Sequence, residues 1–152
     1  MNPMVLVRES GMADVDWHQL AALIERAGLS HRDPRTLQRA YQHSSFVWFG
    51  YVDGVLMATA HAISDMTWAS YLSDVIIDVD YQGKGYGGQL MAAIMETLTP
   101  CGKVFIYSMP EKISFYQRLG FAELTTGMIY AQGEALLRLE EKGFIKARIQ
   151  GA

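Results

Sequence analysis

The chain of 152 residues is poor in cysteine and proline and contains no long apolar run. Its single cysteine, Cys101, excludes a disulfide within the chain, which suits a reducing compartment, so we expect a cytoplasmic protein. No apolar stretch approaches the ~20 residues that a membrane-spanning helix needs, so we expect no membrane partner. The first ten residues, MNPMVLVRES, lack the basic and apolar regions of a secretory signal peptide.

Positive charge is also scarce. Lysine and arginine total 13 against 16 aspartate and glutamate residues, which gives a formal net charge of −3 at pH 7. Because nucleic-acid binding depends on lysine and arginine contacts to phosphates, we expect no nucleic-acid partner. The four histidines are scattered without the spacing of metal ligands, and we therefore expect no metal site.

What is present is the composition of a globular domain with a substantial core. Half of the residues are hydrophobic and 19% are charged. The length and the absence of repeats or low-complexity linkers predict a single domain over residues 1–152. Residues 131–152 are expected to form an extra helical segment at its C-terminal end.

Caps, turn dipeptides and hydrophobic periodicity predict the order of elements. Asp14 and Asp33 are expected to cap helices, and Asp53-Gly54 predicts a tight hairpin turn. Two helices after the first strand break regular β-α alternation, so we expect a mixed α/β sheet instead of a doubly wound fold. Helices are predicted at residues 14–27, 33–42, 87–98, 111–119 and 133–142, and strands at residues 4–8, 45–52, 55–63, 68–78, 103–108 and 127–131.

A glycine-rich stretch, DVDYQGKGYGGQL at residues 78–90, lies between a predicted strand and a predicted helix. Glycines let backbone N–H groups approach a phosphate, and the start of a helix favours an anion. The spacing also fits the G-x-G-x-x-G pattern of dinucleotide-binding proteins. That alternative is disfavoured, because the strand ends well before Gly83 and the next strand carries no terminal acidic residue. A glycine-rich turn without a ligand is the remaining alternative.

Three features of the sequence resemble the GNAT superfamily of N-acetyltransferases. DVIIDVDYQGKGYGGQLM is similar to the family's cofactor motif, in which a hydrophobic strand precedes Arg/Gln-x-x-Gly-x-Gly/Ala and a helix. FYQRLGF, residues 115–121, resembles the family's later aromatic segment, and the element order with its two-helix insert also agrees. The motifs are nearest to the arylalkylamine or serotonin acetyltransferase branch. Val79 departs from the pattern, because many members have proline there. The defining positions of the first motif are Gln82, Gly85 and Gly87.

The resemblance implies a mixed, mostly antiparallel sheet of six or seven strands flanked by helices, with acetyl-coenzyme A (acetyl-CoA) as cofactor. It also implies that a strand edge pairs with the pantetheine arm and that loop amides hold the pyrophosphate. The implied activity is acetyl transfer to a primary amine by direct attack. The residues implied in cofactor binding are Val75, Ile76, Ile77, Gln82, Gly83, Lys84, Gly85, Tyr86, Gly87 and Gly88.

The chemistry of amine acetylation calls for an acid and a base. An alkylammonium has a pKa of about 10.4, so a general base assists its deprotonation, and the departing thiolate gains from a proton donor. The family's tyrosine lies near the thioester sulfur, which makes Tyr116 the candidate acid. Asp74 is the candidate base, because an acidic residue within an apolar strand needs a reason. Alternation predicts that Asp74 shares a face with Leu72 and Ile76.

The acceptor is expected to be a small-molecule amine. The alternatives are a protein amine, at a lysine or an N-terminus, and a CoA-binding sensor without turnover. Trp48, Tyr71 and Tyr130 are candidate linings of an aromatic amine pocket, although core packing is the simpler interpretation of each. The amphipathic segment ALLRLEEKGFI suggests packing against a second subunit, and a homodimer is therefore a further hypothesis.

Overall fold

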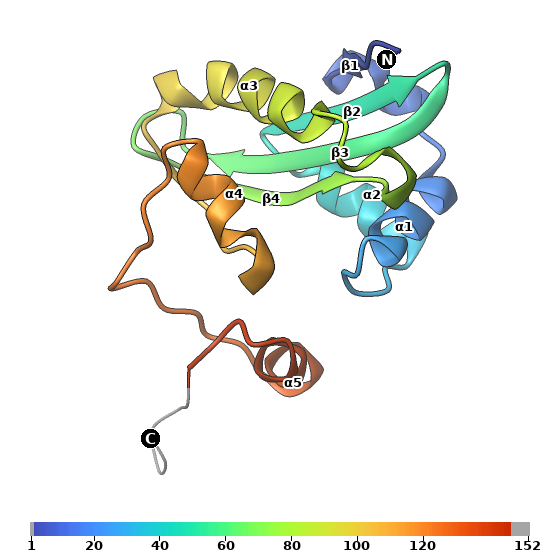
Figure 1. Cartoon of the computed structure of the whole chain (residues 1–152). Helices are drawn as coiled ribbons and strands as arrows, with labels where there is room; N and C mark the ends of the chain where they lie inside the picture. Colours follow the sequence, from blue (N-terminus) through green and yellow to red (C-terminus); the bar gives the residue numbers. More distant parts are fainter. Residues whose placement is uncertain (1, 147–152) are drawn as a thin grey trace. The chain divides into compact units, whose positions relative to one another are not determined.

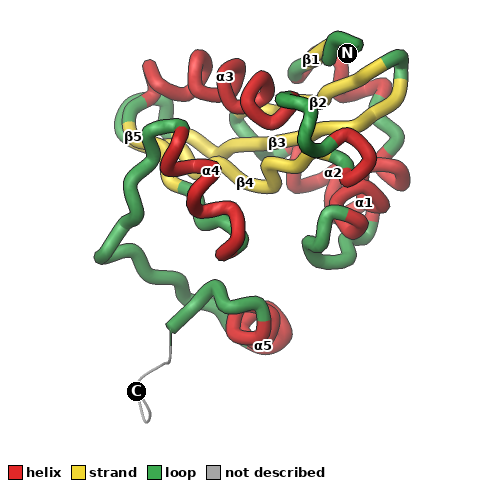
Figure 2. Tube along the Cα trace, in the orientation of Figure 1, coloured by secondary structure: helices red, strands yellow, loops and turns green. Residues whose placement is uncertain are grey.

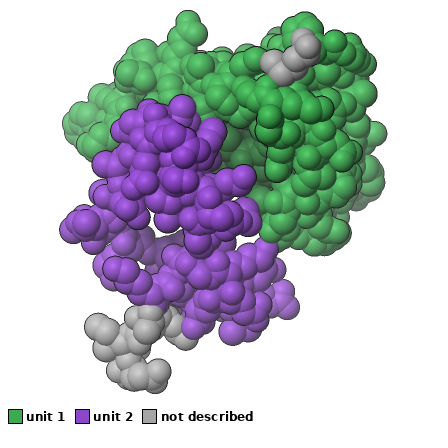
Figure 3. Space-filling model, viewed as in Figure 1, with its two compact units in different colours: residues 1–106 green, residues 107–152 purple. Residues whose placement is uncertain are grey.

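The computed structural model describes residues 2–146 and divides into two compact units. The first unit is Met1–Ile106 and the second is Tyr107–Ala152 (Figure 3). The first unit holds the sheet and the first three helices, and the second holds the last two helices. No helix among the described residues has the length and apolar character that crossing a membrane requires.

The sheet has five strands in the order β1-β2-β3-β4-β5 (Figure 2). Neighbours from β1 to β4 are antiparallel, whereas β5 runs parallel to β4. Asp53 and Gly54 connect β2 to β3 with φ values of 50° and 76°, as a tight hairpin turn requires. The fold class is therefore the expected mixed, mostly antiparallel sheet. The strands are β1 (Val5–Val7), β2 (Phe46–Val52), β3 (Val55–Ser64), β4 (Ala69–Ile77) and β5 (Lys103–Phe105).

Within the first unit, α1 and α2 lie on one face of the sheet and α3 lies on the other (Figure 1). The second unit carries α4 and α5. The helices are α1 (Trp17–Arg26), α2 (Pro34–Gln42), α3 (Tyr86–Leu98), α4 (Ile113–Arg118) and α5 (Gly133–Glu141).

A buried apolar cluster fixes α1 and α2 to the sheet. In α1 the apolar residues recur at helical spacing, so that they share the face turned to the sheet. The cluster places the loop between α1 and α2 beside the middle of β4. Its members are Val15, Leu20, Ala21, Leu23, Ile24, Leu37, Tyr41, Val47, Phe49, Leu56 and Ile76.

The caps of the two helices were predicted with unequal success. The Asp33 carboxylate accepts a hydrogen bond from the backbone N–H of Thr36, as predicted for the start of α2. The predicted cap Asp14 is wrong, because residues 9–14 form a separate 3₁₀ turn. Asp16 takes that role for α1, since its carboxylate accepts from the backbone N–H groups of His18 and Gln19.

The strand predicted at residues 127–131 does not form, and the described residues contain five strands where six or seven were expected. Met128 and Tyr130 are 99% and 84% exposed. A strand needs a hydrogen-bonded neighbour, and the backbone of residues 127–131 makes no backbone hydrogen bond with another described residue. Strand propensity alone therefore gave the wrong assignment here.

Candidate functional site

A bulge interrupts the pairing of β3 with β4 at Asp74. Thr59 pairs with Ile76, and His61 pairs with Ser73, so one residue of β3 faces two of β4. Asp74 adopts φ 51°, in the left-handed region that aspartate tolerates better than most residues. Bulges of this kind re-aim a side chain, and they are frequent beside active sites.

The bulge changes the face on which Asp74 lies. Its carboxylate contacts His61, whose imidazole packs on Tyr41 of α2, so Asp74 faces the α1–α2 side. Ile76 belongs to the core cluster on that side, as alternation predicted. Leu72 does not share this face, and that part of the prediction is wrong, because the extra residue shifts the alternation by one position.

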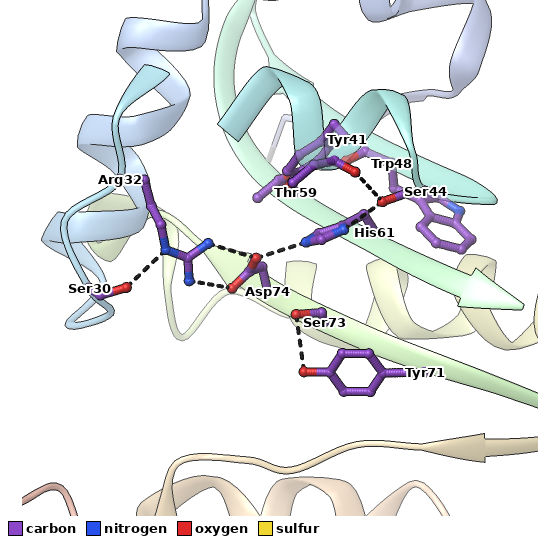
Figure 4. A network of polar contacts seen from close by, with 11 residues as sticks. Ser30, Arg32, Tyr41, Ser44, Trp48, Thr59, His61, Tyr71, Ser73 and Asp74 are labelled. Atoms are coloured by element: carbon purple, nitrogen blue, oxygen red, sulfur yellow. Dashed lines mark hydrogen bonds and ion pairs between the residues drawn. The ribbon is translucent and has the colours of Figure 1, made fainter. Parts of the chain in front are cut away.

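Asp74 is an ionised, nearly buried carboxylate held by two donors. Its side chain is 8% exposed. Arg32 donates from its two terminal nitrogens to Asp74 Oδ2 and Oδ1 at 3.0 and 2.9 Å, and His61 Nε2 lies 2.8 Å from Oδ2 (Figure 4). Burial alone raises the pKa of Asp74, but the hydrogen bonds and charges of His61 and Arg32 outweigh it and hold the pKa far below its usual range.

His61 connects this carboxylate to α2. Because an ionised carboxylate only accepts hydrogen bonds, Nε2 of His61 carries the hydrogen in its contact with Asp74. The other ring nitrogen, Nδ1, lies 2.8 Å from the hydroxyl of Ser44, which itself lies 2.8 Å from the carbonyl oxygen of Ala40 (Figure 4). Ser44, His61 and Asp74 therefore form one continuous chain of hydrogen bonds across the face of the sheet.

One edge of β4 is open beside this network. β5 pairs only with Ala69–Tyr71, and the remainder of β4, through Ile77, has no strand on that side among residues 2–146. The open edge includes Val75, Ile76 and Ile77, whose backbone groups were predicted to pair with pantetheine. An extended amide-containing arm fits such an edge by adding hydrogen bonds as a further strand would.

The glycine loop follows this edge and leads into α3. Gly83 and Gly85 have φ values of 76° and 87°, and Gly85 is the residue that precedes the first turn of α3. A Cβ atom placed on Gly83, Gly85 or Gly88 would meet no heavy atom within 4 Å. The surface of the loop is thus open to a phosphate at the start of a helix, and the residues present fit the pyrophosphate of acetyl-CoA.

The other predicted loop residues differ in what their side chains do. Gln82 donates from its amide to the Ile77 carbonyl at 3.0 Å, which braces the loop against the end of β4. The Lys84 ammonium lies 5.8 Å from the ring centre of Tyr81. Tyr86 is buried and its hydroxyl donates to a backbone carbonyl, so only its main chain is suited to a ligand.

Tyr116 lies on α4 in the second unit. Its ring makes edge-to-face contacts with Phe115 and Phe121, with centroids 5.1 and 5.6 Å apart. Burial raises the pKa of Tyr116 to about 12, so the hydroxyl keeps its proton at neutral pH. These contacts agree with packing, and they leave the predicted role as general acid a prediction.

The remaining sequence candidates separate by burial. Trp48 is 1% exposed and belongs to the core. Tyr71 is 36% exposed and donates its hydroxyl hydrogen to Ser73, beside Asp74 (Figure 4). Apart from these candidates, the thiol of Cys101 is buried and donates to the backbone carbonyl of Thr97 in the last turn of α3.

Sequence reasoning did not identify Arg32, Ser44 or His61 as partners of Asp74. An arginine in a loop and a serine at the end of a helix carry no local signal of a contact with a distant strand. The bulge at Asp74 leaves no signature in a single sequence either. One usable signal was the aspartate itself, because a buried carboxylate requires donors from elsewhere in the chain.

Comparison with known proteins completes the description of the site. The acetyltransferase (GNAT) family pattern matches residues 15–121. Serotonin N-acetyltransferase 2 of Oryza sativa is 30% identical over 71% of this chain and 57% of that protein. A histone acetyltransferase of Glycine max is 29% identical over 74% of this chain and 54% of that protein. The chain thus spans little more than half the length of these two relatives.

Among solved structures, a probable acetyltransferase from Staphylococcus aureus superposes with a TM-score of 0.76 at 18% identity. The similarity covers 86% of this chain and 100% of that one. Agreement at this low identity shows a shared fold, whereas the matched pattern spans most of the chain, including the bulged strand and the glycine loop. The chain therefore belongs to the GNAT family of acetyltransferases.

Proposed function

We propose that this protein transfers the acetyl group of acetyl-CoA to a primary amine of a small molecule by direct attack. One observation carries the proposal. The open edge of β4 runs from the ionised carboxylate of Asp74 to the open loop around Gly83 and Gly85. An anionic side chain and a phosphate-binding loop thus lie at the two ends of an edge suited to an amide-rich arm.

The chain's residues supply binding and orientation. Backbone N–H groups of the loop would hold the pyrophosphate. Backbone groups along the open edge from Val75 to Ile77 would pair with the pantetheine amides, apart from the Ile77 carbonyl, which already accepts from Gln82. Acetyl-CoA contributes an activated carbonyl carbon in a thioester, the donor used by acetyltransferases of this fold. Holding this carbon beside Asp74 makes the attack effectively unimolecular.

Asp74 and Tyr116 are the proposed proton-transfer groups. As the amine nitrogen bonds to the carbonyl carbon, it gains positive charge and becomes much more acidic than a free ammonium. Asp74, directly or through a water molecule, takes the proton from that nitrogen even though its own pKa is low. The carbon–sulfur bond then breaks, and the Tyr116 hydroxyl gives its proton to the departing thiolate.

The surroundings of Asp74 favour a small acceptor with an apolar portion. Tyr71 pairs with Phe105 across β4 and β5, and the two rings are 36% and 40% exposed. Directly paired residues lie on the same face of a sheet. Ser73 pairs with His61, which bonds Asp74, and Tyr71 lies two residues before Ser73 on that face. Tyr71 and Phe105 are therefore on the same side of the sheet as Asp74. The relative named as a serotonin N-acetyltransferase supports this acceptor class. The relative named as a histone acetyltransferase favours a protein lysine as the second candidate.

Thiol release from acetyl-CoA tests the proposal. The amine panel holds arylalkylamines, polyamines, amino sugars, amino acids and lysine or N-terminal peptides. We expect turnover with small amines, and Tyr71→Ala should raise KM for the best amine with little change in KM for acetyl-CoA. Turnover only with peptides would show that the acceptor is a protein amine and not a small molecule. CoA binding in calorimetry without any thiol release would identify a binding protein without turnover.

A further inference from the structure

Two ion pairs fasten the α1–α2 region to β4. At the end of α1, Arg26 donates to Asp78 Oδ2 at 2.6 Å. In the loop that precedes α2, Arg32 donates to both oxygens of Asp74. The two aspartates bracket the open part of β4, so one pair lies at the glycine-loop end and the other at the bulge.

We infer that Arg32 is a positioning residue for acyl transfer, which aims the Asp74 carboxylate at the bulge and couples the α1–α2 loop to acceptor binding there. The inference rests on the proposed function for its catalytic meaning. Arg32 itself touches neither the acceptor nor the donor in this scheme. It acts through Asp74.

The geometry of the pair is that of a rigid fork. The two terminal nitrogens of Arg32 each bond a different Asp74 oxygen at 3.0 and 2.9 Å, so the carboxylate plane is fixed with respect to the guanidinium plane. The third nitrogen, Nε, donates to the hydroxyl of Ser30 at 2.9 Å. Ser30 and Arg32 both lie in the loop between α1 and α2, so a displacement of that loop moves the carboxylate.

Because the Arg32–Asp74 pair is largely buried, water cannot readily replace Arg32 as a donor to Asp74. The side chains of Asp74 and Arg32 are 8% and 29% exposed, so solvent replaces the guanidinium poorly. The groups that face Asp74 are Arg32 from the loop, His61 from β3 and the neutral Tyr41 from α2. Without Arg32, His61 is the only one of these groups that donates to the carboxylate.

The Arg26–Asp78 pair supplies a matched control. It joins the same helical region to the residue that directly follows β4, and Asp78 is also buried. It lies next to the glycine loop and away from the bulge. Arg26→Ala is therefore expected to weaken acetyl-CoA binding, whereas Arg32→Ala is expected to impair use of the amine.

Steady-state kinetics of the full chain tests this division. For Arg32→Ala we expect kcat/KM for the amine to fall at least about tenfold, with KM for acetyl-CoA unchanged within about twofold. Arg32→Lys should restore only part of the loss, because an ammonium keeps the charge but lacks the fork. If both variants impair the kinetic constants for the amine and for acetyl-CoA to the same extent, Arg32 merely stabilises the fold and the inference is wrong.

A second measurement does not depend on turnover. The carboxyl ¹³C resonance of Asp74, assigned by its loss in Asp74→Asn, is followed against pH in the wild type, Arg32→Lys and Arg32→Gln. We expect the glutamine variant to titrate at clearly higher pH than the wild type. An unchanged titration would overturn the inference. A wild type that releases no thiol with any amine would instead count against the proposed function, and the titration would still decide whether Arg32 controls Asp74.

Discussion

The imidazole of His61 lies against the ring of Tyr41, with centroids 4.3 Å apart and an angle of 31° between the planes. Tyr41 is fully buried and its hydroxyl lies 2.6 Å from that of Thr59. One face of the His61 ring therefore packs on the core, whereas its two nitrogens make the hydrogen bonds to Ser44 and Asp74. The core beneath α2 thereby sets the position of the proposed catalytic carboxylate.

This relationship predicts that His61→Phe separates packing from hydrogen bonding. A phenyl ring keeps the contact with Tyr41 but removes the donor to Asp74 and the partner of Ser44. We expect the free energy of unfolding to fall by about 1–3 kcal/mol, the cost of leaving a buried polar group without its partner. Acetyl transfer should also fall. Urea denaturation and thiol release measure the two effects.

The matched control is His43→Ala. His43 is the residue before Ser44, but its exposed ring lies with Nδ1 2.9 Å from the carbonyl oxygen of Arg39 in α2 and not on the carboxylate of Asp74. Equal losses of unfolding free energy and of thiol release in His61→Phe and His43→Ala would show that the buried hydrogen bonds of His61 contribute no more than an exposed contact.

The ionised state of Asp74 predicts a defined pH dependence of stability. Its pKa in the folded chain lies below the unfolded value of about 3.9, so its carboxylate stabilises the fold above that pH. This contribution is lost as the pH falls below about 4 towards the folded pKa. We therefore expect the difference in unfolding free energy between wild type and Asp74→Asn to shrink as the pH falls below about 4. A difference that grows in acid would contradict this assignment.

Much of the first unit was predictable from sequence because its signals are local. Asp33-Pro34 marks a helix start, Asp53-Gly54 marks a hairpin, and the apolar spacing of residues 87–98 marks α3. Each signal depends on a few neighbouring residues, and each element forms in the structure. The glycine loop was located for the same reason.

The polar network was only partly predictable because it depends on contacts that are distant in sequence. Asp74 was identified as an acidic residue that needed a reason. Its partners Arg32 and His61 lie 42 and 13 positions away, and only the folded sheet and insert bring them together. The strand predicted at residues 127–131 failed in a related way, since a strand depends on a neighbour that the segment itself does not encode.

The glycine loop predicts a variant that separates stability from binding. Gly88 lies in the first turn of α3, and a Cβ atom there meets open space. Gly88→Ala should leave the free chain as stable or stabilise it by up to about 1 kcal/mol, because alanine favours a helix. The added methyl group should weaken CoA binding, since it lies where the backbone was open to phosphate. Thermal unfolding and calorimetric titration with CoA measure the two.

Ala92→Gly in the same helix is the control for Gly88→Ala. Ala92 is exposed and lies one turn further along α3. The Ala92→Gly variant should be about 1 kcal/mol less stable than the wild type and should keep its affinity for CoA. Unchanged CoA affinity in Gly88→Ala would remove the loop from the cofactor site.

The raised pKa of Tyr116 predicts how its removal affects the rate. With a pKa of about 12, the hydroxyl stays protonated from pH 6.5 to 9.5 and is available as a donor throughout that range. Tyr116→Phe keeps the edge-to-face contacts with Phe115 and Phe121 but removes the proton. We expect kcat to fall at least about tenfold, because general acid catalysis contributes about 10²–10⁴-fold. The factor should be the same at every pH in this range, because the hydroxyl stays protonated throughout it. If Tyr116→Phe retains full kcat with an unaltered unfolding transition, the hydroxyl does not protonate the thiolate, and water or another donor has that role.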